Sequence, residues 1–266
     1  MKVKSGSSAL ITCSLIFFLT ESINFAQPGN PVSRWTFDND TGRCALDESA
    51  QKKDSVYGSF EYVPGVSGNA IKLDGFRTYI QRDQYDISQL GGAFTIECWI
   101  ALASYPWSWA PVVDCSYERV KGYFFGIGPE GHLGFRVGAG NSWYEITTGE
   151  TVPMRKWTHV AAVFEPGKKI TLFINGTEAA SEDITGNLIP RWGGSLTIGR
   201  NNGAQTWFEP QLTTPESYFF LDGILDEITI SGLAKTGELI RSEVAGVTGF
   251  PVPALSSRDR RPPAVR

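Results

Sequence analysis

The sequence is poor in the residues that build many catalytic and metal centres. Its 266 residues include two histidines and four cysteines, and these do not cluster with metal-ligand spacing. His132 and His159 lie in different strand-like runs. The sequence therefore predicts no His/Cys metal centre and no histidine-based catalytic triad.

Long basic stretches and long apolar runs are also missing. With a formal net charge of -4 and no basic stripe, the chain offers no electrostatic basis for binding nucleic acid. The run "ALITCSLIFFL" after "MKVK" is shorter than the about 20 apolar residues that span a bilayer, and no other segment is longer. Its length and charge are typical of a signal peptide, so we expect residues 1–26 to be removed and the protein to be secreted, periplasmic or at the cell surface.

Export permits disulfides, but few cysteines are available. Cleavage at residue 26 leaves Cys44, Cys98 and Cys115, so at least one thiol stays unpaired. Cys98 and Cys115 flank the segment "SYPWSWAP" at 104–111. The sequence leaves two readings open: they pair, or each is a small buried hydrophobic residue.

Helical patterning is nearly absent, and strand patterning takes its place. Between residues 33 and 231, short runs rich in β-branched and aromatic residues alternate with Gly, Pro, Asn and Asp. "GPEGH" at 128–132 and "EPGKK" at 165–169 are typical of hairpin connections. One short helix is expected after Gly237. The pattern predicts an all-β sandwich or jelly roll.

Four segments, in this order, resemble the LamG-like jelly-roll family of the concanavalin A-like lectin/glucanase superfamily. They are "RWTFD" with "GVSGNAIKLDG" (34–38, 65–75), "FTIECWI" (94–100), "KWTHVAAVFEPGKKITLFINGTEAA" (156–180), and "SLTIGR" with "FLDGILDEITIS" (195–200, 220–231). The resemblance implies a two-sheet antiparallel jelly-roll β-sandwich over 27–248, with ligands at the concave face or its loops. The Pro- and Arg-rich residues 249–266 are expected to be a linker or a disordered tail.

A glycosidase active site of the superfamily's kind is not expected in this domain. Retaining glycosidases need two carboxylates about 5 Å apart, which a strand supplies through a pattern such as E-x-D-x-x-E. The sequence contains no such pattern. Asp226 and Glu227 are neighbours on one strand, so their side chains should point to opposite faces.

Asp226 is instead a candidate metal ligand. By strand alternation it should share a face with Ile224, Ile228 and Ile230, where a carboxylate needs a partner. Calcium suits oxygen ligands and an exported protein, and the resemblance implies a structural calcium near the first and last strands, with Asp38 as second ligand. The alternative is that Asp226 accepts backbone hydrogen bonds or pairs with an arginine. Asp74 is expected to be a turn residue.

The eight tryptophans are the strongest hint of a ligand surface, because sugar rings stack on aromatic planes beside polar groups. Trp35, Trp99 and Trp157 lie in strand motifs and are expected in the core. The candidate ligand-binding residues lie in or beside loops: Trp107, Trp109, Trp143, Arg200, Asn201, Asn202 and Trp207. For each loop tryptophan, including Trp192, the alternative is that it covers a sheet edge.

"SYPWSWAP" is expected to join two paired strands as a hairpin, with Trp107 and Trp109 facing the same way. Taken together, these features favour an exported, non-catalytic glycan-binding module, a targeting part of a larger carbohydrate-active protein. Its partner would be a glycan or glycoprotein. The alternatives are a protein-binding or adhesion module and, third, a glycoside hydrolase with scattered carboxylates.

Overall fold

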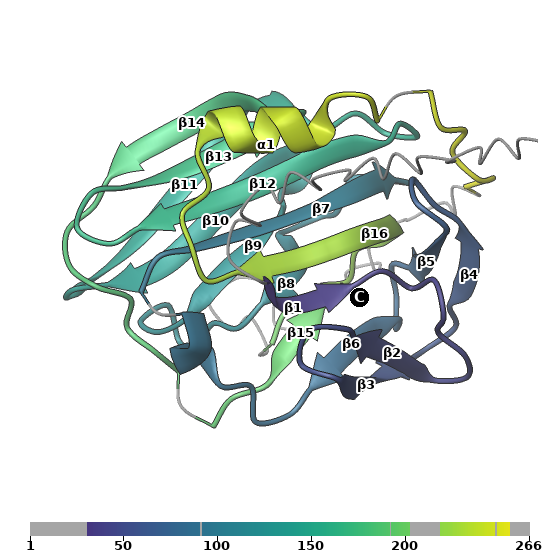
Figure 1. The fold of residues 1–266 in the computed structure, drawn as a ribbon, viewed down its shortest axis with the longest axis horizontal. Coiled ribbons are helices and arrows are strands. Elements are labelled where there is room, and N and C mark those ends of the chain that lie inside the picture. The colour runs from purple at the N-terminus through teal and green to yellow at the C-terminus, as the bar shows by residue number, and fades with distance from the viewer. Residues whose placement is uncertain (1–30, 91, 192, 203–218, 248, 256–266) are drawn as a thin grey trace, which may run out of the picture.

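The computed structural model describes residues 31–90, 92–191, 193–202, 219–247 and 249–255. The expected signal peptide at 1–26, Trp192, Trp207 and the end of the tail lie outside the described residues. In the described part, two antiparallel sheets, called sheet A and sheet B below, stack face to face, and one short helix lies against sheet A (Figure 1). The predicted two-sheet antiparallel sandwich is confirmed.

Sheet A contains eight strands, and β16 lies near its middle. Along the sheet the order is β14 (Thr177–Asp183), β13 (Lys169–Ile174), β12 (Thr158–Glu165), β7 (Phe94–Leu102), β16 (Asp222–Ser231), β5 (Asn69–Asp74) and β4 (Glu61–Pro64). β1 (Pro31–Trp35) also pairs with β16. β5 and β1 pair with the first and second halves of β16, so the two strands meet near its centre.

Sheet B also contains eight strands, and its order places β11 at one edge and β2 at the other. That order is β11 (Ser142–Thr151), β10 (His132–Ala139), β9 (Tyr123–Ile127), β8 (Ala110–Asp114), β15 (Leu196–Ile198), β6 (Tyr79–Arg82), β3 (Lys52–Tyr57) and β2 (Cys44–Asp47). Short 3-10 turns cover Ile87–Leu90 and Pro129–Gly131. The predicted hairpins at 128–132 and 165–169 join β9 to β10 and β12 to β13.

The core fills the space between the sheets with aromatic and branched side chains. Phe94 stacks on Phe164 and contacts Phe135 from the opposite sheet, so apolar burial holds the two layers together. A charged cluster is also buried there: Arg82 pairs with Asp47 at 2.7 Å and with Asp54 at 2.6 Å. Arg82 offsets part of the charge of the two carboxylates, and Trp35 Nε1 and backbone N–H groups donate to them as well, so the core tolerates their burial.

Trp35 is fully buried in this core, as predicted, whereas Trp99 and Trp157 are buried on the outer face of sheet A. There the C-terminal segment covers them, with Val252 and Leu255 packing against the same cluster. These two residues belong to the stretch that the sequence groups with the tail.

The helix α1 (Gly237–Val244) begins after the N-cap Thr236, whose side chain accepts a hydrogen bond from the Leu239 N–H. Its buried Ile240 packs with Phe173 of β13, and Figure 1 shows the helix lying over this part of sheet A. This contact explains why "KITLFING" is apolar on both sides although β13 lies next to the edge strand.

The expectation that 104–111 forms a hairpin is wrong. β7 belongs to sheet A and β8 to sheet B, so the segment crosses between the layers instead of pairing its flanks. Cys98 and Cys115 therefore lie in different sheets, where both are buried free thiols; Cys44 is free and exposed.

The prediction that Asp226 shares a strand face with three isoleucines holds for Ile224 but is wrong for Ile228 and Ile230, because β16 contains a β-bulge. The register against β7 shifts between Asp226 and Thr229, and Glu227 adopts a positive φ of 49°. Ile228 and Ile230 consequently face the core, whereas Asp226 lies at the bulge. Simple alternation fails at this point, since one extra residue reverses the faces.

Candidate functional site

A row of cross-strand neighbours runs over the outer face of sheet B. Cross-strand partners share a face, so the pairings place these side chains side by side, opposite to the core. From β11 to β6 the row consists of Glu145, Arg136, Phe124, Asp114, Thr197 and Gln81. This row connects two clusters of aromatic and charged side chains.

We call the first group the Trp109 cluster: Trp109, Phe124, Arg136, Trp143, Glu145 and Arg119. The Trp109 indole lies directly over Gly128 and Gly134. A Cβ atom on either glycine would collide with the ring. Phe124 meets the same ring edge-on, with centroids 6.3 Å apart. The two glycines thus form a shelf that holds the Trp109 ring against sheet B.

Arg136 occupies the centre of the Trp109 cluster. Its guanidinium lies 4.3 Å from the centroid of the Trp109 ring and 5.1 Å from that of Phe124, and the residue is 6% exposed. Burial lowers the pKa of Arg136 to about 10, which the charge of Glu145 partly offsets. Arg136 still carries a proton at physiological pH, so a positive charge lies under the aromatic surface.

Glu145 links the charged groups to the second indole. Its Oε1 accepts hydrogen bonds from Trp143 Nε1 and from the Arg119 guanidinium, each 2.8 Å long, and its Oε2 lies 3.5 Å from Arg136 Nε. Trp109, Trp143 and Glu145 all remain partly accessible to solvent. The cluster therefore presents two indoles around a carboxylate and two guanidinium groups.

The second group, the Arg200 cluster, lies at the other end of the row and contains Tyr57, Tyr79, Gln81 and Arg200. Tyr57 and Tyr79 stack with centroids 4.7 Å apart, and the Arg200 guanidinium lies 3.7 Å from the Tyr79 ring. Arg200 also donates to the Gln81 side chain at 3.2 Å. This region again combines aromatic rings with a guanidinium group.

The predicted site residues separate into distinct positions. Trp109 and Trp143 come together in the Trp109 cluster, and Arg200 lies on the same face of sheet B. Asn202 donates its backbone N–H to Asp114 in the middle of the row at 2.7 Å, whereas Asn201 is 1% exposed and accepts from the Phe219 N–H. Trp107 is 55% exposed in the crossing segment.

Sequence reasoning missed Phe124, Arg136, Glu145 and Arg119. They are separated along the chain, and only the sheet register brings them together. One signal was available: Gly134, Gly138 and Gly140 in "HLGFRVGAG" leave little side-chain bulk on the face of that strand that carries Arg136. Glycine inside a strand often marks the close approach of another group, and here that group is the Trp109 ring.

The two predicted metal ligands hold a turn. Asp226 is fully buried and accepts N–H groups from Val66 at 2.7 Å, Ser67 at 3.1 Å and Glu227 at 2.8 Å. Asp38 accepts the N–H of Asn69 at 2.7 Å. Burial raises the pKa of Asp226 to about 7, although its backbone hydrogen bonds act in the opposite direction.

These donors make a poor match to a calcium site. N–H groups occupy both carboxylate oxygens of Asp226, and a cation needs free oxygens there. No group of three His, Cys, Asp or Glu residues that would hold a metal occurs among the described residues. The hydrogen-bonded alternative accounts for the buried carboxylate, and calcium stays a prediction.

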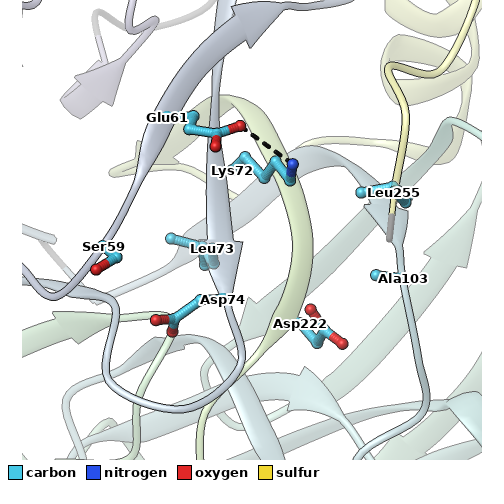
Figure 2. A pocket seen from close by; sticks show the side chains of 8 residues that line it. All are labelled: Ser59, Glu61, Lys72, Leu73, Asp74, Ala103, Asp222 and Leu255. Atoms are coloured by element: carbon cyan, nitrogen blue, oxygen red, sulfur yellow. Dashed lines mark hydrogen bonds and ion pairs between the residues drawn. The ribbon is translucent and has the colours of Figure 1, made fainter. Parts of the chain in front are cut away.

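A small cavity of about 170 Å³ lies beside β4, β5 and β16 (Figure 2). Its charged groups already have partners: Lys72 pairs with Glu61 at 3.1 Å, and Ser104 donates to Asp222 at 2.6 Å. Asp74 accepts three successive N–H groups of the following turn, as its predicted turn role requires. None of the predicted site residues lines this cavity.

Comparison with known proteins agrees with this architecture. The Laminin_G_3 family model, described as the concanavalin A-like lectin/glucanases superfamily, matches residues 74–241. The chain belongs to this superfamily. No curated protein matches the chain.

Solved structures with a similar fold include a domain of an arabinanase and the binding domain of a toxin. One is Domain 4 of AbnA, a GH43 extracellular arabinanase from Geobacillus stearothermophilus, in complex with arabinotriose. It is 18% identical to this chain, the TM-score is 0.57, and the match covers 82% of this chain and 100% of that domain. The binding domain of botulinum neurotoxin DC in complex with rat synaptotagmin II is 15% identical with a TM-score of 0.61, covering 82% of this chain and 52% of the toxin domain.

A third similar structure is that of botulinum neurotoxin type C, whose cell uptake is described as dependent on two ganglioside molecules. It is 16% identical with a TM-score of 0.62, and the match covers 82% of this chain and 51% of the toxin chain. This chain thus spans about half the length of the toxin structures that it matches. At these identities the likeness shows a shared fold. None of the described helices has the length and apolarity to cross a membrane.

Proposed function

We propose that the Trp109 cluster binds a glycan and that the chain is an exported, non-catalytic carbohydrate-binding module. The observation that carries this proposal is the grouping of the partly exposed Trp109 and Trp143 around Glu145, Arg119 and Arg136 on the outer face of sheet B. Aromatic planes suit the apolar faces of sugar rings, and charged side chains suit hydroxyl groups.

Charge-assisted hydrogen bonds give such a surface its orientation. Glu145 accepts, whereas Arg119 and Arg136 only donate, so the cluster offers both roles to a ring that carries several hydroxyl groups. Because Arg136 is held between Trp109 and Phe124, its position costs little conformational entropy on binding.

The comparisons support this function by analogy of fold. One similar domain is described in complex with arabinotriose, and a similar toxin is described as depending on two ganglioside molecules for cell entry. A targeting role within a larger carbohydrate-active protein and export by a signal peptide are parts of the same proposal.

The test is a glycan array probed with the full chain and three variants. Trp143→Ala and Trp109→Ala should each weaken binding by about ten-fold or more, the usual cost of truncating a central aromatic contact. Phe250→Ala removes an exposed aromatic ring over sheet A and should leave binding unchanged. Equal binding by all three variants would show that the glycan, if bound, lies elsewhere.

Protein binding is the second candidate, and one comparison favours it. A toxin domain of the same fold is described in complex with synaptotagmin II. An aromatic surface with arginines is also typical of protein interfaces. If the array is blank while the chain captures a deglycosylated protein partner, and Trp143→Ala prevents the capture, the Trp109 cluster serves a protein instead.

A further inference from the structure

A groove of about 480 Å³ opens on the outer face of sheet A, the face opposite the Trp109 cluster. Outward-facing residues of β1, β7, β12 and β16 form its floor, and the C-terminal segment forms one wall. We call it the Glu97 groove. The proposed glycan site uses none of its residues.

Two buried polar atoms of the residues that line this groove, Glu97 Oε2 and His159 Nδ1, have no hydrogen-bond partner among the described residues. Glu97 is 6% exposed; its Oε1 accepts from Lys235, but its Oε2 has no hydrogen bond. His159 is 5% exposed, its Nδ1 is likewise unpaired, and its Nε2 lies 3.7 Å from Glu97 Oε2. A buried acceptor without a donor is costly, which indicates a ligand that donates hydrogen bonds here.

The charged side chains around the groove indicate the sign of the ligand's charge. The lining contains three carboxylates, Glu97, Glu227 and Glu243, and two cationic side chains, Arg34 and Lys235. Arg34 pairs with Glu227 at 2.9 Å, and Lys235 pairs with both Glu97 and Glu243. One negative charge is left over, so a ligand with a single positive charge would neutralise the lining.

His159 adds an acceptor rather than a second positive charge. Burial, aided by the charge of Lys235, lowers the pKa of His159 to about 3, so its ring is neutral at physiological pH. A neutral imidazole accepts a hydrogen bond through one ring nitrogen. Thr229, the cross-strand neighbour of Glu97, places a hydroxyl group in the same lining.

The remaining lining is apolar and indicates the body of the ligand. Val66, Val247 and Phe250 line the groove together with Trp99. Trp99 is only 9% exposed and meets His159 edge-on at 5.4 Å, so it offers no open ring face to a sugar. These walls suit a narrow alkyl chain better than a saccharide.

We propose that the Glu97 groove binds a primary ammonium group on an alkyl chain, as in a free alkylamine or a lysine side chain. The ammonium has three N–H donors and one charge. Glu97 Oε2, the His159 ring and the Thr229 hydroxyl would receive the donors, and the alkyl chain would lie against Val66, Val247 and Phe250.

The test is isothermal titration calorimetry of the full chain at pH 7 with n-pentylamine, 1-pentanol and pentanoate. The amine should bind, and the neutral and anionic analogues of equal length should not. Glu97→Gln should weaken amine binding by about ten-fold or more, because it removes a charge-assisted hydrogen bond. Glu165→Gln is the matched control, since Glu165 pairs with Lys168 on the β12–β13 hairpin outside the groove.

A second variant keeps the proposal testable if Glu97→Gln does not fold. Val247→Arg leaves Glu97 and Lys235 in place, adds a positive charge at the wall, and should also abolish amine binding. The peptide acetyl-Gly-Lys-Gly-amide distinguishes the two sources of the ammonium group: tighter binding than pentylamine indicates a lysine side chain, and weaker binding a free amine. Equal affinity for pentanol, or unchanged amine binding by both variants, would overturn the proposal.

Discussion

Replacing Asp226 by alanine should destabilise the fold strongly without changing the surface. The residue is fully buried, and its carboxylate accepts the N–H groups of Val66, Ser67 and Glu227. A hydrogen bond contributes about 1 kcal/mol to a neutral acceptor and up to about 3 kcal/mol to a charged one, so three give roughly 3–9 kcal/mol for a carboxyl group whose pKa is about 7. Removing the cost of burying a carboxylate offsets part of this loss. We expect a net decrease of about 3–5 kcal/mol in the free energy of unfolding, a large share of a typical domain's stability.

Urea denaturation followed by tryptophan fluorescence at pH 7 measures this quantity. Asp226→Asn keeps one acceptor oxygen and should fall between the wild type and the alanine variant. Asp38→Ala is the control, because Asp38 accepts one backbone N–H of the same turn at an exposed position and should cost about 1 kcal/mol. A loss below about 1 kcal/mol for Asp226→Ala would refute the assignment of Asp226 as the anchor of the 65–69 turn.

Four further outcomes are expected. Excess EDTA should leave the melting temperature unchanged, since N–H groups already occupy Asp226; a calcium-dependent rise would instead establish the predicted metal site. The pKa of His159 is about 3 in the folded protein, below its unfolded value, so the neutral ring contributes fully to the free energy of unfolding above about pH 6.5, and this contribution is lost as the pH falls toward 3. The free energy of unfolding of His159→Gln should therefore fall less than that of the wild type between about pH 6.5 and 3. Identical pH dependence of the two proteins would contradict this. Gly134→Ala should displace the Trp109 ring and weaken glycan binding in titrations while the far-ultraviolet circular dichroism stays the same. Arg82→Met should cost about 3–5 kcal/mol in urea unfolding because it leaves the buried Asp47 and Asp54 without their cationic partner, and a neutral effect would show that the cluster is dispensable.

Strand existence could be predicted from the sequence because period-two patterns and turn residues act locally. "KITLFING" illustrates this: the NG pair ends β13 and starts a hairpin to β14. The pairing of strands depends on residues that are far apart in the sequence, so local patterns predicted it less well. "SYPWSWAP" has the composition of a turn, yet it carries the chain from one sheet to the other.

Strand pairing also limited how much of the candidate site could be predicted from the sequence. Trp109 and Trp143 were predicted from composition, since loop aromatics are rare enough to be noticed. Arg136 and Glu145 were not, because each resembles an ordinary solvent-facing strand residue until the register of β10 and β11 places them opposite each other. The bulge at Glu227 likewise has no clear sequence signal, and it reverses the face of every following residue in β16.

A crystal structure of the full chain with the glycan that binds it most tightly on the array would locate the binding site directly. We expect sugar rings against the indoles of Trp109 and Trp143, with hydroxyl groups bonded to Glu145 and to Arg119 or Arg136. Glycan density on sheet A, or at any position that leaves the Trp109 cluster open, would contradict it.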